Sequence, residues 1–353
     1  MTRLGRVGYR RHYYYDGVRR WGCSPMDEAL GISEELSQGV RHDIVKLSVG
    51  RTFEEAAQVY EELMRVKVST TTAWEKTQAA GRRARPALNP MSTTAAVRGR
   101  PRTGMAILMD GFMAPLRQEG WKEVKIGCVC AFEGTGDIQS RKPGSEPMEV
   151  VHAFDQSFVM HLGGPEGVSV KLAAEAEARR WHDAPERAVL GDGATWIWNI
   201  AKREYAQAAH EVDWYHAKEH LYAAAEIAFP NRPDQSHAWV NLQADQLYAG
   251  QARHIADQLR VLAARAHPEA RAKLESEAGY FSNNHERMQY HDFQQAGLPI
   301  GSGTIESGAK RAKKRVSGAG MRWSRPGLEN MLALQSAYMS HSFDAFWPRI
   351  CPF

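Results

Sequence analysis

The sequence predicts an α/β protein in which a mixed β-sheet has helices against its faces, with a small helical domain before it and an all-helical insertion within it. Three observations lead to this fold class. Apolar residues recur at helical spacing over residues 33–81. Short apolar or β-branched runs alternate with helical segments between residues 104 and 214. Residues 217–290 are rich in alanine, lack strand patterns and are divided by three prolines.

Charge is distributed unevenly along the chain of 353 residues. The formal net charge is +4, but residues 1–104 carry +7 and residues 305–325 carry +6, so the remainder carries −9. Basic zones of this kind are typical of proteins that bind a polyanion. The alternative for either zone alone is a solvated face that keeps the protein in solution.

Composition excludes several classes of protein. No apolar run reaches eighteen residues, so we expect no membrane span and no membrane partner. The first residues lack the apolar core of a secretory signal. Four cysteines are too few for a disulfide scaffold. We therefore expect a cytoplasmic protein with reduced thiols.

Residues 1–32 have an irregular pattern rich in tyrosine and arginine, and the helical pattern begins at Ser33. Thr52 and Glu55 form a capping box at the start of a second helix. Ser69 is placed to cap a third helix that runs to about Gly81.

Three short helices with a tight turn before the third predict a helix-turn-helix domain over residues 33–81. The start of the third helix would then enter the major groove of DNA. The residues expected to face DNA there are Thr70, Thr71, Thr72 and Lys76. The alternative is a helical bundle that packs on the next domain.

Residues 82–103 predict an exposed basic linker, because arginines and prolines occur there without any acid. This linker is suited to follow a phosphate backbone, although a merely soluble linker is the alternative. The arginines are Arg82, Arg83, Arg85, Arg98, Arg100 and Arg102.

The sheet-containing core is expected in two parts, 104–216 and 297–353, separated by the helical insertion 217–296. Strand patterns occupy 104–110, 124–132, 150–154, 188–192 and 210–214. Helical patterns occupy 169–181 and 195–208. After the insertion, one helix is expected from Thr304 and another over 327–340.

Three acids stand at positions suited to chemistry. Asp110 and Asp192 each end a buried apolar run and precede glycine, which places them at the rim of a sheet. Glu306 lies in the first turn of a helix and is followed by five cations. The plainer alternatives are two Asp-Gly turns and a first-turn glutamate favoured by the helix dipole.

Three carboxylates that converge repel one another unless a cation lies between them. Mg²⁺ or Mn²⁺ prefers such oxygen ligands, and a pair of these ions supports phosphodiester cleavage. Nearby cations would then hold a nucleic-acid backbone. The cations expected to do so are Lys310, Arg311, Lys313, Lys314, Arg315 and Arg322.

Two further clusters carry weaker signals. His216 and His220 share one helix face, where zinc binding is conceivable, but no third ligand is evident nearby. A packing role, or for His216 an approach to the acidic site, is the alternative. Cys128 and Cys130 lie on one face of a strand and are best explained as small buried residues.

The succession LMDG, LGDGATWI, VDWYHAKEHL, IGSGTIES, SGAGMRWS and FDAFW resembles bacterial insertion-sequence transposases of the DDE type, in particular the Kra-type group related to Mutator-like transposases. The resemblance begins at about residue 33 and reaches the C-terminus. It implies a ribonuclease-H-like catalytic core with a helical insertion before the last acid. By motif, the catalytic and metal-binding acids are Asp110, Asp192 and Glu306. Trp196, His216 and His220 match family positions that would support the active site.

The N-terminus departs from this family. Relatives often have a cysteine-rich, zinc-ribbon-like segment before the stretch that matches Pro25–Glu28, but here only Cys23 remains. One cysteine does not make a tetrahedral site, so no zinc is expected. We interpret residues 1–32 as a degenerate form of this segment.

The resemblance implies a transposase that binds the terminal inverted repeats of an insertion sequence, cleaves a strand with metal-activated water and transfers the freed 3′-hydroxyl to target DNA. DNA and a second copy of the chain are the expected partners, and the nucleoid is the expected location. Two alternatives remain: a catalytically inactive or domesticated DNA-binding regulator, and a structure-selective nuclease or resolvase on the same fold.

Overall fold

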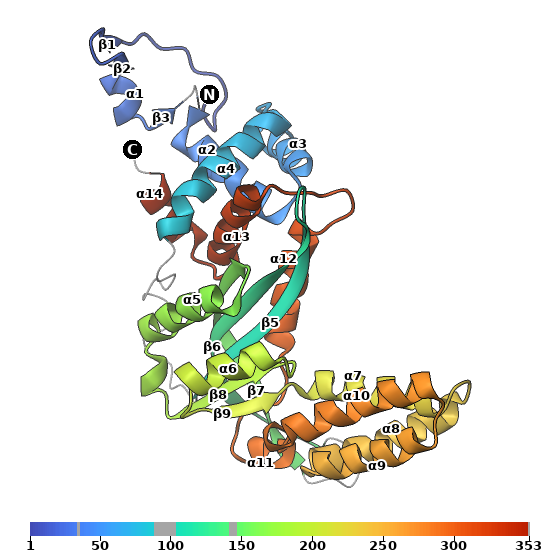
Figure 1. The fold of residues 1–353 in the computed structure, drawn as a ribbon. Coiled ribbons are helices and arrows are strands. Elements are labelled where there is room, and N and C mark those ends of the chain that lie inside the picture. The colour runs from blue at the N-terminus through green and yellow to red at the C-terminus, as the bar shows by residue number, and fades with distance from the viewer. Residues whose placement is uncertain (34–35, 88–103, 141–146, 352–353) are drawn as a thin grey trace.

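The computed structural model of the chain describes residues 1–33, 36–87, 104–140 and 147–351. A five-stranded mixed sheet lies at its centre, with the strand order β7-β6-β5-β8-β9 (Figure 1). The strands are β5 (Gly104–Leu116), β6 (Gly120–Ser140), β7 (Pro147–Leu162), β8 (Glu186–Gly191) and β9 (Ala209–Val212). β5, β6 and β7 pair antiparallel, whereas β5, β8 and β9 pair parallel. The predicted mixed sheet and α/β class are confirmed.

The first three strands are longer than predicted. The β5–β6 pairing continues through Phe112↔Val124 to Leu116↔Gly120, where Gly120 has a φ of +69° and closes the turn. Apolar runs mark only the part of a strand that is covered on both faces. The outer parts of these strands mix polar and apolar residues and carry no such mark.

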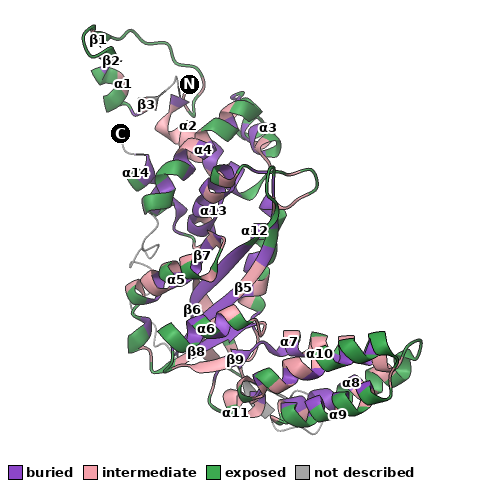
Figure 2. Ribbon diagram, in the orientation of Figure 1, coloured by how far each residue is buried: buried purple, intermediate pink, exposed green. Residues whose placement is uncertain are grey.

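Helices cover both faces of the sheet because successive strand residues point to opposite sides. Ile107 and Met109 pack with α5 (Pro165–Ala178) and α6 (Thr195–Glu204). Ala106 and Leu108 pack with α12 (Gly303–Val316) and α13 (Arg325–Met339). Figure 2 shows the resulting buried centre of the sheet. Residues from both ends of the chain therefore complete one core.

Three helices precede the sheet: α2 (Gln38–Gly50), α3 (Phe53–Met64) and α4 (Thr70–Ala87). The predicted capping box at Thr52 and Glu55 is present in α3. Ser69 precedes α4 and its hydroxyl accepts a hydrogen bond from the Thr72 N–H at 3.0 Å. The capping signals therefore located two of these helix starts correctly.

Helix α4 does not end near Gly81, so residues 82–87 are helix and not the start of a linker. A Cβ added at Gly81 would lie 2.5 Å from the Cβ of Asn330, so this glycine allows α4 and α13 to cross closely. Glycine here serves helix packing and does not terminate the helix. The remainder of the expected linker, 88–103, including Arg98, Arg100 and Arg102, lies outside the described residues.

The N-terminal helices share a core with α13 and with α14 (Phe343–Ile350). Buried Val40, Ile44 and Tyr60 contact this core together with Leu334 and Trp347. The bundle packed on the next domain, the alternative to a free-standing DNA-binding unit, is therefore present in the structure.

The expected insertion consists of helices throughout its described residues. Four of them, α7 (Trp214–Ala228), α8 (Pro233–Tyr248), α9 (Ala252–Ala264) and α10 (Pro268–Asn284), form a bundle that projects from the sheet (Figure 1). Short η2 (His285–Arg287) and α11 (Tyr290–Gln295) lead back to the core. No described helix has the length and apolar character that a membrane span requires.

Residues 1–33 are not wholly irregular, contrary to the expectation. They form a two-stranded ribbon of β1 (Tyr14–Asp16) and β2 (Trp21–Cys23), followed by α1 (Pro25–Ala29). Ile32–Ser33 (β3) pairs with Leu36–Ser37 (β4) just before α2. Strands of two or three residues are too short to leave a periodic pattern in a sequence.

Glu211 on β9 is fully buried, and neither carboxylate oxygen has a hydrogen-bond partner among the described residues. Burial raises its pKa well above the usual range for glutamate. Because the folded-state pKa exceeds the unfolded value of about 4.3, the unfolded chain releases this proton first. Folding stability is therefore lost through this group as the pH rises above that value.

We accordingly expect Glu211→Gln to increase the free energy of unfolding near pH 8 by at least about 1.4 kcal/mol, the equivalent of one pKa unit. The gain should shrink towards pH 4 because the carboxyl is then neutral in both states. Urea unfolding at several pH values measures it. Glu186→Gln, an exposed site on neighbouring β8, is the control, and a gain that does not depend on pH would contradict the assignment.

Candidate acidic active site

The sheet register places two of the predicted acids side by side. Met109 on β5 pairs with Gly191 at the end of β8, and the two strands run parallel. Asp110 and Asp192 each come one residue later. Because β8 ends at Gly191 while β5 continues, Asp192 lies at the sheet rim beside the middle of β5.

Glu306 approaches this pair on helix α12. Ile305 and Ala309 of this helix pack on the sheet face formed by Ala106 and Leu108, which is the face that Asp110 shares by alternation. The backbone N–H of Glu306 donates to the Ser302 carbonyl at 3.1 Å, which holds the acid in the first turn of the helix. Three acids separated by 82 and 114 residues in the sequence are thus near enough for the charges of Asp192 and Glu306 to act on Asp110.

The three carboxylates influence one another electrostatically. Burial raises the pKa of Asp110 above its usual range, and the negative charges of Asp192 and Glu306 raise it further. A hydrogen bond from the Gly111 N–H, 2.6 Å from Asp110 Oδ1, and the nearby His216 act in the opposite direction. The charges of Asp192, Glu306 and His216 therefore all affect the pKa of Asp110.

Asp192 lies in a tight turn held by neighbouring groups. Its Oδ1 accepts a hydrogen bond from the Ala194 N–H at 2.9 Å. Gly193 has a φ of +104°, and a Cβ there would lie 2.6 Å from the ring of Tyr280. The Tyr280 hydroxyl donates to the Asp192 carbonyl at 3.0 Å. Tyr280 belongs to α10, so the helical insertion helps to shape this turn.

Glu306 is turned towards a cation. Its Oε1 lies 2.5 Å from Lys310 Nζ, one helical turn further along α12. Both side chains are substantially exposed, and exposed ion pairs contribute little to stability. Within the described part of the chain, no group of three or more His, Cys, Asp or Glu side chains is arranged to hold a metal ion.

The two histidines have different surroundings. His216 lies at the start of α7, near enough to Asp110 to lower its pKa, and its Nδ1 is 3.2 Å from Glu219. His220 stacks on Tyr280 at a ring separation of 3.5 Å and pairs with Glu277 at 2.6 Å. His216 therefore acts on Asp110 through its charge, whereas His220 joins α7 to α10.

Trp196 follows the Asp192 turn at the start of α6. The ammonium of Lys125 lies 4.4 Å from the centre of its ring, and Lys125 also pairs with Glu123 at 2.7 Å. These contacts fix the start of α6 against β6. They give Trp196 a packing role next to the acid that precedes it.

Asp213 joins the segments that carry the acids, and motif reasoning missed this role. It is buried at the N-cap of α7, where one oxygen accepts the His216 N–H at 2.7 Å and the other accepts the Ser302 N–H. Its own N–H donates to the Gly191 carbonyl at 2.8 Å. The only sequence signal was an acid directly before a helix.

Most of the predicted cations of α12 are exposed, namely Lys310, Arg311, Lys313 and Lys314. Arg322, which lies beyond the helix, is also exposed. Arg315 is the exception, because its side chain is buried, contrary to the expectation of a DNA-facing cation. It is 5% exposed, donates to the Ser48 carbonyl at 2.9 Å and lies over the rings of Phe53 and Trp323. Burial lowers its pKa to about 10. Arg315 thus joins α12 to the N-terminal helices and does not face DNA.

A basic cavity of about 680 Å³ separates α12 from the N-terminal helices. Arg51, Arg311 and Lys314 line it, together with Glu55. The exposed cations of α12 therefore continue on to the helical domain, so that one positive surface connects the two parts.

The expected DNA-facing residues of α4 lie at its open end. Thr70 and Thr71 are exposed, while Thr72 and Lys76 are half-buried. Further along α4, Arg82, Arg83 and Arg85 are also exposed. Arg83 donates to the Ile350 carbonyl at 3.5 Å, and Arg85 pairs with Glu329 at 2.6 Å. The last two therefore also connect α4 to the C-terminal helices.

The four cysteines form no disulfide. Cys23, Cys128, Cys130 and Cys351 are free thiols, and the last three are buried. This agrees with a packing role for Cys128 and Cys130.

Comparison with known proteins places the chain in a family. No curated protein matches it. One family model matches residues 1–344, which include the helical domain, the sheet, the insertion and all three acids. The chain therefore belongs to the uncharacterised protein family UPF0236.

Proposed function

We propose that this protein is a transposase that binds the ends of a DNA element and catalyses metal-dependent strand cleavage and strand transfer. The observation that carries the proposal is the approach of Asp110, Asp192 and Glu306 to one another from distant parts of the sequence, with mutual repulsion acting on Asp110. The strand order, with β5 central and the antiparallel strands on one side, supports a ribonuclease-H-like core.

The acidic site fits hard divalent ions by its chemistry. Its donors are carboxylate oxygens. Burial raises the pKa of Asp110, the charges of Asp192 and Glu306 raise it further, and a bound cation would act in the opposite direction. Asp110, Asp192 and Glu306 would hold Mg²⁺ or Mn²⁺. When bound, two such ions activate water and stabilise the leaving oxygen of a phosphodiester.

The chain's own groups would orient the DNA strand at this site. Lys310, Arg311 and Lys314 lie on the helix that carries Glu306, so phosphates bound there lie next to the acids. His216 is placed beside Asp110, where it would exchange a proton with a reacting oxygen.

The start of α4 would recognise the element ends. Its exposed threonines form the first turn of a helix that packs against α2, α3, α13 and α14. We propose that this helix enters the major groove as in a helix-turn-helix. Paired ends need at least two protomers, so we also propose an oligomer on DNA.

The proposal is tested with the purified full-length protein and labelled duplexes taken from the DNA that flanks its gene. A nick at one fixed position that leaves a 3′-hydroxyl, appears only with Mg²⁺ or Mn²⁺ and is followed by joining to a plasmid supports a transposase. Specific binding without cleavage would favour a regulator. Cleavage of branched DNA regardless of sequence would favour a nuclease or resolvase.

We expect Thr71→Ala and Lys76→Ala to weaken binding to the flanking duplex by roughly 1–3 kcal/mol each, the range for contacts to bases. A mixed-sequence duplex should be affected less. Fluorescence anisotropy without divalent ions measures both. Thr135→Ala and Lys273→Ala, at exposed sites elsewhere, are the controls. An unchanged footprint would remove α4 from recognition.

A further inference from the structure

The N-terminal arm, defined here as residues 1–23, is a second basic surface near α4. It contains six arginines and one acid, Asp16. Figure 2 shows the arm as exposed along most of its length, and Figure 1 shows the β1–β2 ribbon standing away from the body. A charged segment of this kind is favourable only where solvent or a polyanion surrounds it.

The arm is held at two points. Arg3 lies over Gly39 and makes a two-pronged ion pair with Asp43 on α2, at 2.7 and 2.6 Å. Further along, Tyr9 and Arg11 both contact Asp27 on α1. Two-pronged arginine–carboxylate pairs fix geometry as well as distance. The arm is therefore a positioned element.

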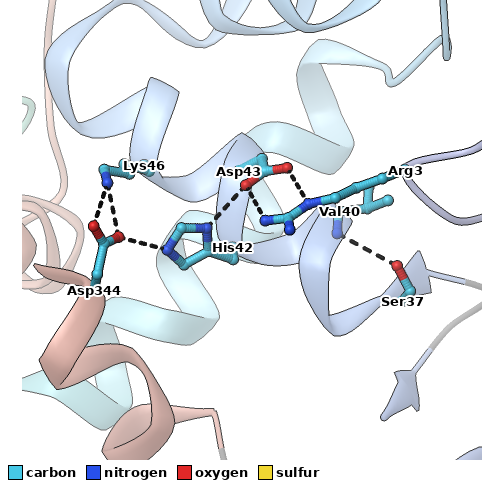
Figure 3. A network of polar contacts seen from close by, with 7 residues as sticks. All are labelled: Arg3, Ser37, Val40, His42, Asp43, Lys46 and Asp344. Carbon is cyan, nitrogen blue, oxygen red and sulfur yellow. Dashed lines mark hydrogen bonds and ion pairs between the residues drawn. The ribbon is translucent and has the colours of Figure 1, made fainter. Parts of the chain in front are cut away.

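The first of these anchors belongs to a larger network (Figure 3). Asp43 also contacts His42 Nδ1 at 2.9 Å, and His42 Nε2 contacts Asp344 at 2.8 Å. Lys46 pairs with both oxygens of Asp344 at 2.7 Å. The arm is thus tied through α2 to the C-terminal helix α14.

Between the anchors, two cations of the arm remain available to bind a ligand. Arg6 and Arg10 are exposed, and neither has an ion-pair partner among the described residues. Arg6 lines a cavity of about 840 Å³ between the arm and α4. Lys67, Thr72 and Lys76 line its opposite side. The cavity therefore brings arm cations and the proposed recognition helix to one place.

The ribbon adds exposed aromatic rings to these cations. Tyr14, Tyr15 and Trp21 are each about three-fifths exposed, at 60%, 64% and 59%. Tyr13 is similarly exposed, at 62%, and its ring lies close to Gly22 across the ribbon. Exposed rings interspersed with arginines are typical of nucleic-acid-binding surfaces, because they contact sugars and bases while the cations contact phosphates.

We propose that the N-terminal arm binds duplex DNA beside α4, with Arg6 and Arg10 on the backbone and minor groove next to the major groove that α4 occupies. This inference rests on the proposed function. Duplex DNA is favoured because the arm is strongly cationic and lies next to a helix start suited to the major groove. The cavity is large enough for part of one backbone strand. Arginine-bearing arms reach narrow minor grooves, where the negative potential is strongest.

The test measures equilibrium binding in EDTA, so that it does not depend on cleavage. The probes are a fluorescein-labelled duplex from the flanking DNA and a mixed-sequence duplex, each of about 40 base pairs, roughly four helical turns. A single strand of equal length is the third probe. The variant is Arg6→Ala with Arg10→Ala. Arg265→Ala with Lys273→Ala removes the same charge from exposed sites in the helical insertion and is the control.

We expect the arm variant to bind both duplexes roughly tenfold more weakly and to lower the slope of log K against log salt by about 1.8, or 0.9 for each lost phosphate contact. Hydroxyl-radical protection of sugars beside the α4 footprint should also disappear. The control should retain the wild-type slope and footprint.

Equal effects of the two double variants, or tighter binding of the single strand than of the duplex, would overturn the inference. These outcomes are separate from the fate of the proposed function. A protein that cleaves element ends but binds normally without Arg6 and Arg10 refutes only the arm. A protein that never cleaves but loses duplex binding with the arm variant refutes only the transposase.

Discussion

Replacing Asp110 by Asn is expected to lower the rate of strand cleavage by at least about 10³-fold, a loss of about 4 kcal/mol of transition-state stabilisation. Asparagine keeps the shape of the side chain and still accepts the hydrogen bond from the Gly111 N–H. It removes the negative charge that would hold a divalent ion. Asp192→Asn and Glu306→Gln are expected to have the same effect, since each removes one ligand from the same site.

Binding to the flanking duplex separates a catalytic defect from misfolding. The three variants should bind this duplex within about twofold of the wild type, because none of them alters a cation that we propose to contact DNA. Repulsion from the acids falls in each variant, so any change should favour binding. Denaturing gels give the cleavage rate, and anisotropy gives the affinity. Normal cleavage by any one of the three would remove that residue from the site.

Two controls narrow the interpretation. Asp257→Asn removes an exposed carboxylate from the helical insertion and should cleave normally. Lys310→Ala breaks the ion pair with Glu306 without touching a carboxylate. If Glu306→Gln acted only by releasing Lys310, both variants would lose the same activity. We expect Lys310→Ala to weaken DNA binding and to retain most of the cleavage rate at saturating DNA.

The sequence predicted the core because a strand that is buried on both faces has an uninterrupted apolar run. Such a run can be recognised without knowing which strands lie next to it. The runs before Asp110 and Asp192 are uniformly apolar, so two buried strands and the acids that follow the runs could be located, although β5 continues past Asp110. The fold then added what no local pattern contains, namely that β5 and β8 are parallel neighbours in register. Adjacency of the two acids follows from that pairing alone.

Side-chain surroundings were predictable only where they are local. The capping box of α3 is a contact between residues three apart, and it is present as expected. Arg315 looks like its neighbours in a cationic run, but Phe53 and Trp323 enclose it. Phe53 lies 262 residues away in the sequence. Burial of one cation among several was therefore invisible before the helices were placed together.

Helix ends were misjudged for a similar reason. Gly81 has the form of a helix terminator, but its missing side chain is where Asn330 of α13 packs. The arginines that follow Gly81 are therefore part of helix α4. Two of them contact the C-terminal helices, Arg85 on α13 and Arg83 on α14. A glycine has two uses in helical proteins, as a terminator or as a site of close packing, and a single sequence does not distinguish them.

Asp213→Asn is expected to reduce cleavage by about 10- to 100-fold, the range for a small misplacement of reacting groups. Asparagine is a good N-cap, so it still accepts the His216 N–H. Its amide group, however, would face the Ser302 N–H as a second donor. Ser302 is the residue whose carbonyl receives the Glu306 N–H. The substitution therefore disturbs the position of Glu306 while it leaves the cap of α7 in place.

A purely structural role for Asp213 would lower stability alone. The buried Ser302 N–H left without an acceptor is expected to cost about 1–3 kcal/mol of unfolding free energy. Ser324→Ala, which removes the N-cap contact of α13 at 3.2 Å, is a matched lesion of about 1 kcal/mol away from the acids. It should lower the melting temperature and leave the cleavage rate per folded molecule unchanged.

The Mg²⁺ dependence of cleavage distinguishes positioning from stability. If Asp213 holds Glu306 in register with the two aspartates, the Asn variant should need a higher Mg²⁺ concentration for its half-maximal rate, whereas Ser324→Ala should not. A wild-type rate and Mg²⁺ midpoint in the Asn variant would show that the contact to Ser302 only stabilises the fold. Asp213 contacts Gly191, His216 and Ser302, three segments that flank the acids. The substitution thus tests whether Asp110, Asp192 and Glu306 act as one site, because it alters none of these three residues.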